Sequence, residues 1–285
     1  MKPQLLFPAY FRVVGFVLAL AGLILGYICM VRNEAIAFLD HDGNSLTKNF
    51  AATFEVTGLM FLGFSRLKNE NEETGWLRLN ALYWSVLVGF LLAMLGWVLD
   101  LIGTALNIRF LLDLPGLLSY YPFALLWVFT GRFYYQLSRN KAHKPCKPVY
   151  LFTYKPWLPA IRSICVFFFL LIIATENVTA IDDFIKKITP DGPLLLFPVS
   201  LVIWIWSKQK NETGMIGDIR LGAMQVAVYV NYILFLIATW YYYGLDYLFI
   251  EIYTLISIPI LFLCIFYFRL FMLRKKANGM VLTDS

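Results

Sequence analysis

A polar run of 17 residues occurs twice in this 285-residue chain, at positions 65–81 and 207–223. The copies align without a gap at an offset of 142 residues, half the chain, and eight positions are identical, where chance would give about one. In the first copy, the shared residues are Ser65, Lys68, Asn69, Glu70, Gly75, Arg78, Leu79 and Ala81. The repeat indicates a tandem duplication and predicts two similar halves, 1–142 and 143–285.

The composition predicts that both halves lie in a membrane. Hydrophobic residues make up 60% of the chain and charged residues 15%, whereas soluble domains carry about 25% charged residues. The aromatic share of 18% suits the Trp and Tyr belts of membrane proteins. Four scattered cysteines and two separated histidines predict neither a disulfide framework nor a metal site. No cofactor is expected.

Each half contains four apolar segments, and a helix needs about 20 such residues to cross a bilayer. The eight predicted segments are 9–30, 51–64, 82–101, 117–135, 159–175, 193–206, 221–243 and 247–271. The first is too long for a signal peptide and contains Arg12, so we expect it to be retained. The second segment of each half is unusually short. The chain is therefore predicted to be an all-α integral membrane protein with eight transmembrane helices.

The distribution of charge predicts the orientation. With the N-terminus inside, 19 of the 24 basic residues face the cytoplasm, and 12 of the 18 acidic residues lie on the opposite side. This bias is the one expected of a bacterial inner-membrane protein. Each half has an even number of helices, so both termini are cytoplasmic and the two four-helix repeats are parallel.

The repeated run lies at the predicted cytoplasmic ends of helices. The candidate partner-binding residues are Lys68, Asn69, Glu70 and Arg78 in the first copy and Lys210, Asn211, Glu212 and Arg220 in the second. One interpretation is a docking surface for a cytoplasmic protein. The other is structural: a tight turn made by Asn and Gly, followed by arginines that extend to the lipid headgroups.

Four of the polar residues inside predicted membrane segments are candidates for a function there: Glu55, Arg132, Asn231 and Arg269. A carboxylate in a membrane is costly and therefore a functional candidate, but Glu55 also fits an acid at the outer edge of its predicted segment. Asn231 is expected to hydrogen-bond a neighbouring helix. The two arginines either extend to the cytoplasmic headgroups or capture an anion.

The two copies also carry a resemblance. The pattern Ser-[Arg/Lys]-x-Lys-x-Glu followed by Ile/Leu-Arg-Leu, at 65–79 and 207–221, together with Val-Ala-Val-Tyr-Val-Asn-Tyr at 226–232, resembles a group of functionally uncharacterised polytopic membrane proteins of Bacteroidetes-type bacteria. It is more distantly similar to small bacterial four-helix membrane proteins. The first copy departs from the pattern, with Trp84 and Gly89 in place of an aromatic-Asn sequence. The resemblance implies an inner-membrane location and this architecture, and no activity.

Two functions remain open. The absence of nucleotide-binding and hydrolase motifs favours a non-enzymatic protein that docks a cytoplasmic partner, in signalling for example. The alternative is a transporter or channel for a small solute or cation, with a polar cavity between the two short segments and Asn231. Lipid is the expected surrounding, nucleic acid is not an expected partner, and homo-oligomerisation stays open.

Overall fold

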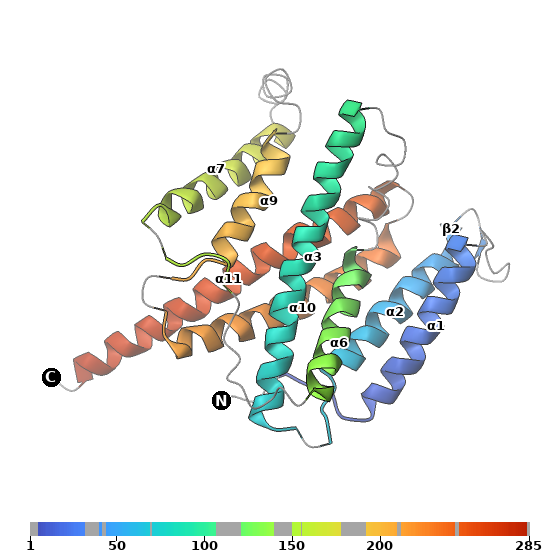
Figure 1. Cartoon of the computed structure of the whole chain (residues 1–285), viewed down its shortest axis with the longest axis horizontal. Coiled ribbons are helices and arrows are strands. Elements are labelled where there is room, and N and C mark those ends of the chain that lie inside the picture. The colour runs from blue at the N-terminus through green and yellow to red at the C-terminus, as the bar shows by residue number, and fades with distance from the viewer. Residues whose placement is uncertain are drawn as a thin grey trace. The chain divides into compact units, whose positions relative to one another are not determined.

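The computed structural model describes residues 5–31, 40–41, 44–68, 70–106, 121–139, 150–154, 156–177, 192–209, 212–242 and 245–283. Within these ranges the regular secondary structure is helical apart from a small antiparallel hairpin of β1 (Asp40–His41) and β2 (Asn44–Ser45). The helices are α1 (Phe11–Val31), α2 (Leu46–Phe64), α3 (Glu72–Leu106), α6 (Tyr121–Ser138), α7 (Leu158–Asn177), α9 (Gly192–Ile205), α10 (Gly214–Tyr241) and α11 (Leu245–Thr283) (Figure 1). The predicted all-helical class is confirmed.

Four of the described helices are long and apolar enough to cross a membrane. Their apolar stretches are Phe11–Cys29, Glu72–Gly96, Gly214–Tyr241 and Ile256–Lys275. A shorter apolar stretch, Leu158–Leu171, lies in α7. Judged on described residues alone, α2, α6, α7 and α9 do not meet the same criteria. Length and hydropathy therefore support a membrane protein with at least four candidate spans.

The chain divides into two compact units. The first comprises 1–148 and 218–285 and holds α1, α2, α3, α6, α11 and most of α10. The second comprises 149–217 and holds α7 and α9. The units do not coincide with the two halves of the duplication, because the end of the chain packs with the first unit. The boundary of the duplication at 142/143 remains a prediction from the sequence.

Helix α3 begins ten residues before the predicted segment, at Glu72. Asn71 caps it: the Thr74 N–H donates to Asn71 Oδ1 at 2.8 Å, and the Asn71 N–H donates to Thr74 Oγ1 at 3.0 Å. This reciprocal pair satisfies N–H groups that the first helical turn leaves without partners. Helix α10 likewise begins at Gly214, and the Gly217 N–H donates to the Thr213 carbonyl at 3.1 Å. We expected a tight turn around Gly75 and Gly217. That expectation is wrong, because both glycines lie within helices.

Helix α2 also begins earlier than predicted, at Leu46, and has 19 residues. The expectation of an unusually short second segment is wrong for the first half. The expectation holds for α9, which has 14 residues with Pro198 inside it. The start of α2 is not predicted by hydropathy because its first turn is polar, and hydropathy does not distinguish a polar helical turn from a loop.

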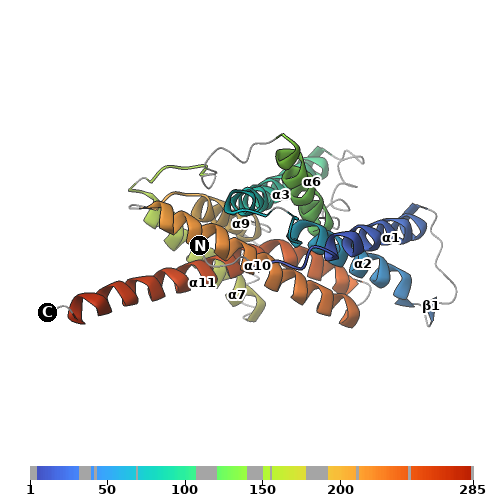
Figure 2. The same ribbon diagram turned by 90° about the horizontal axis from the view of Figure 1, so that it is seen from below.

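Helices α1 and α2 of the first unit pack closely side by side (Figure 2). Aromatic rings add further contacts between helices of this unit. A Cβ atom on Gly15 would lie 2.7 Å from the Gly58 carbonyl oxygen, and one on Gly22 would lie 2.5 Å from the Glu55 nitrogen. Such backbone approach through small residues is typical of helix pairs in membranes. Phe64 of α2 then packs on Phe129 of α6, with ring centroids 4.9 Å apart.

The second unit is smaller. Helices α7 and α9 pack together, and the rings of Phe169 and Phe197 stack with centroids 5.6 Å apart.

Candidate functional site

The first copy of the repeated run begins with a loop tied to the segment before α1. The Phe7 N–H donates to the Phe64 carbonyl at 3.0 Å, and the Arg66 N–H donates to the Phe7 carbonyl at 2.9 Å. These two bonds form a short parallel bridge between Phe7 and Ser65. The bridge fixes the chain direction as it leaves α2.

A buried ion pair closes this loop. The Glu70 carboxylate accepts the Leu67 N–H at 2.7 Å. It also accepts both arms of the Arg78 guanidinium, at 2.6 Å and 3.1 Å. The second arm of Arg78 donates in addition to the Ser65 carbonyl at 3.0 Å. A planar guanidinium suits this fork geometry, whereas an ammonium group does not. We call the set Ser65, Leu67, Glu70 and Arg78 the arginine clasp.

The clasp lies inside the protein. Arg78 has no exposed side-chain surface, and Glu70 is 17% exposed. The guanidinium lies over the Phe133 ring of α6, 4.7 Å from its centroid. The expectation that Arg78 extends to the lipid headgroups is therefore wrong, and a residue so buried cannot contact a partner directly. Its charge is instead compensated by Glu70, a carbonyl and an aromatic face.

The second copy repeats the loop geometry within the second unit. The Leu151 N–H donates to the Trp206 carbonyl at 3.0 Å, and the Lys208 N–H donates to the Phe152 carbonyl at 2.9 Å. The Glu212 carboxylate accepts the Gln209 N–H at 2.8 Å, as Glu70 accepts that of Leu67. Glu212 also accepts the Tyr150 hydroxyl at 2.9 Å. Both loops therefore share two features at equivalent positions: a parallel bridge, Phe7–Ser65 or Phe152–Ser207, and a glutamate that accepts the backbone N–H three residues earlier.

The second arginine of the repeat, Arg220, is also buried, with 2% of its surface exposed. Its guanidinium lies over the Phe266 ring of α11 at 4.9 Å and approaches the Tyr83 hydroxyl at 3.5 Å. The expectation that Arg220 extends to the lipid headgroups is therefore wrong. Arg269 of α11 lies against α10, the helix that carries Arg220. Its Nη1 atom is 3.1 Å from the position that a Cβ atom on Gly222 would occupy.

Three basic residues of the two loops are exposed: Arg66, Lys68 and Lys208. Only Lys68 was among the predicted partner-binding residues. Arg66 and Lys208 were missed, although they occupy equivalent positions and are both basic. The predicted residues Asn69, Lys210 and Asn211 lie outside the described residues.

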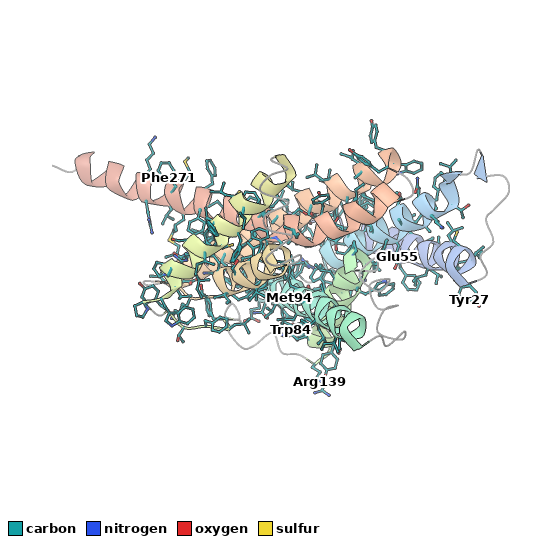
Figure 3. All side chains as sticks on the ribbon, turned by 90° about the horizontal axis from the view of Figure 1, so that it is seen from above. Tyr27, Glu55, Trp84, Met94, Arg139 and Phe271 are labelled. Atoms are coloured by element: carbon teal, nitrogen blue, oxygen red, sulfur yellow. The ribbon has the colours of Figure 1, made fainter. Side chains whose placement is uncertain are left out.

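Glu55 lies at the middle of α2, as the tenth of its 19 residues. Its Oε1 accepts the Trp127 indole N–H of α6 at 2.7 Å. Glu55 is labelled in Figure 3. Glu55 therefore lies further from the first residue of its helix than predicted, because α2 begins five residues before the apolar segment, and its place at the outer edge of the membrane stays a prediction. The half-buried carboxylate joins two helices of the first unit.

The other two intramembrane candidates also have partners. The Ser257 hydroxyl of α11 donates to Asn231 Oδ1 of α10, which is the interhelical hydrogen bond that we expected. Asn231 is 2% exposed, and its Nδ2 atom has no hydrogen-bond partner within the described part of the chain. Arg132 lies over the Trp84 ring, 3.8 Å from the centroid. Among the described residues, no group of three His, Cys, Asp or Glu side chains could hold a metal ion.

These features define the class: an all-helical chain with helices that can cross a membrane and two loops of one design, each followed by a buried arginine. Comparison with models of protein families, with curated proteins and with solved structures found no match.

Proposed function

We propose that the chain is a multi-pass protein of the bacterial inner membrane that docks a cytoplasmic protein through its two repeated loops. In this proposal eight transmembrane helices form two parallel four-helix repeats, with both termini in the cytoplasm. The charge asymmetry of the sequence and the resemblance to Bacteroidetes-type membrane proteins support this arrangement. That the chain is related to this group of Bacteroidetes-type membrane proteins is itself part of the proposal.

The observation that most directly supports docking is a hydrogen bond that the two loops share. Glu70 and Glu212 each hold a backbone N–H three residues earlier, at 2.7 Å and 2.8 Å. A loop that is fixed in this way loses little conformational entropy when it binds. The buried residues thus give each loop its shape, and the exposed cations Arg66, Lys68 and Lys208 are left to contact an acidic surface.

Charge reversal tests the proposal. The triple variant Arg66→Glu, Lys68→Glu, Lys208→Glu should keep its fold, because all three side chains are exposed. Lys48→Glu is the control, since Lys48 is exposed on the predicted opposite side of the membrane. Quantitative mass spectrometry of copurifying proteins should find at least one cytoplasmic protein that the control retains and the triple variant loses more than tenfold. An identical set of proteins from both variants would contradict docking.

A second candidate function rests on Glu55. A carboxylate midway along an intramembrane helix is costly to maintain and often marks an ion pathway. Glu55 accepts a hydrogen bond from the neutral indole N–H of Trp127, which leaves its charge available to a cation. A channel or transporter for a small cation predicts flux in proteoliposomes that Glu55→Gln abolishes. Equal flux in protein-free liposomes and in proteoliposomes would exclude this candidate.

A further inference from the structure

An open groove of about 430 Å³ lies between α1, α2 and α6 in the first unit. Its lining residues are Arg12, Val13, Phe16, Leu62, Thr130 and Tyr134. Apolar side chains form its body: Val13 is 67% exposed and Phe16 is 61% exposed. Neither the docking proposal nor the cation proposal uses this surface.

One end of the groove is cationic. The exposed guanidinium of Arg12 interacts with the hydroxyl of Tyr134. That hydroxyl donates to the Leu62 carbonyl at 3.1 Å and is thereby held at the groove. Arg12 belongs to the basic residues that the charge distribution places at the cytoplasmic headgroups.

A buried hydroxyl without a partner lies beside these groups. Thr130 lines the groove and is only 7% exposed, yet its Oγ1 atom makes no hydrogen bond with any residue that the structure describes. A threonine in a helix usually donates to a carbonyl of its own preceding turn. A buried hydroxyl left unpaired costs about 1–3 kcal/mol. Thr130 is therefore ready to donate to a ligand in the groove.

We propose that this groove binds one anionic glycerophospholipid. The phosphate lies against the Arg12 guanidinium, which the Tyr134 hydroxyl helps to position. Thr130 donates to an ester carbonyl, and an acyl chain runs along Phe16 and Leu62. A lone phosphate ion would leave the apolar body unused, whereas a lipid uses both parts. The assignment to the cytoplasmic leaflet rests on the proposed topology, but binding itself does not.

Native mass spectrometry of the purified full-length chain tests this site. The probes are phosphatidylglycerol, phosphatidylcholine of the same chain length, and inorganic phosphate. We expect one phosphatidylglycerol to bind at least tenfold more tightly than phosphatidylcholine, and inorganic phosphate not to compete. Arg12→Gln should weaken the binding of phosphatidylglycerol about tenfold, as the loss of a charge-assisted hydrogen bond implies.

Arg162→Gln is the matched control, because Arg162 is the equivalent basic residue near the start of α7 and does not line the groove. It should leave phosphatidylglycerol binding unchanged. Thr130→Val should weaken both lipids several-fold, since both have ester carbonyls, and Phe16→Trp should weaken them by filling the groove. Three results would each overturn the proposal. They are equal affinity for the two lipids, an equal loss of phosphatidylglycerol affinity in Arg12→Gln and Arg162→Gln, and full competition by inorganic phosphate.

Discussion

Arg78 and Glu70 form a salt bridge of 2.6 Å between the first turns of α3 and the loop before it, and Arg78 is completely buried. The pair joins residues that are eight positions apart. In the first copy, Glu70 shapes the loop by accepting the Leu67 N–H, and Arg78 neutralises the glutamate. The clasp therefore has consequences for stability that can be measured.

Replacing Arg78 should destabilise the protein, because a buried carboxylate loses its partner. Arg78→Leu should lower the free energy of unfolding by about 3 kcal/mol. Arg78→Lys keeps the charge but loses the fork and the stacking on Phe133, and should cost about 2 kcal/mol. Denaturation in detergent micelles measures both. Arg66→Gln, an exposed control, should stay within about 0.5 kcal/mol of the native protein.

The second loop should open locally when Glu212 is altered. Glu212→Gln weakens the bonds to the Gln209 N–H and the Tyr150 hydroxyl. Loss of about 1–2 kcal/mol of local stability would raise the rate of tryptic cleavage after Lys208 by roughly 5- to 30-fold. Gln209→Ala keeps the backbone N–H and should leave this rate near that of the native chain. Equal cleavage rates in both variants would show that Glu212 does not fix the loop.

The α1–α2 pair should not tolerate a side chain at Gly58. A Cβ atom there would lie 2.7 Å from the Gly15 carbonyl oxygen, which is closer than real Cβ contacts allow. Gly58→Ala should therefore cost about 1–3 kcal/mol of stability. Gly131→Ala in α6 is the control, since nothing lies within 4 Å of its Cβ position. The control should be neutral or slightly stabilising, because alanine favours helix.

Asn231 and Ser257 should be energetically coupled through their hydrogen bond between α10 and α11. Asn231→Leu and Ser257→Ala should each cost about 1 kcal/mol. The double variant should cost less than the sum, since each change removes the same bond. A double-mutant cycle in detergent gives the coupling energy directly. Fully additive costs would mean that the bond contributes nothing to stability.

The sequence predicted the helical class well, because an apolar run of membrane length has few alternative folds. It failed where a helix begins in polar residues. Asn71 and Thr74 start α3 ten residues before the apolar run, and Leu46 starts α2 five residues before it. Hydropathy alone does not detect such capped polar turns.

The candidate site was predicted in part. The duplication identified Glu70, Arg78 and their equivalents, but it did not separate buried residues from exposed ones. The burial of Arg78 depends on Phe133, which lies 55 positions away in another helix. Long-range packing of that kind cannot be deduced from a motif. The equivalent basic pair Arg66 and Lys208 was visible in the alignment of the two copies and could have been found.

The central claim is that both repeated loops lie on the cytoplasmic side of the membrane. Single cysteines at Lys68→Cys, Lys208→Cys and Lys48→Cys, in a chain whose four native cysteines are replaced, test it by labelling with a membrane-impermeant maleimide. The account predicts that positions 68 and 208 react in inverted vesicles and not in spheroplasts, and that position 48 does the reverse. Reaction of positions 68 and 208 from opposite sides, or of both from the periplasm, would contradict it.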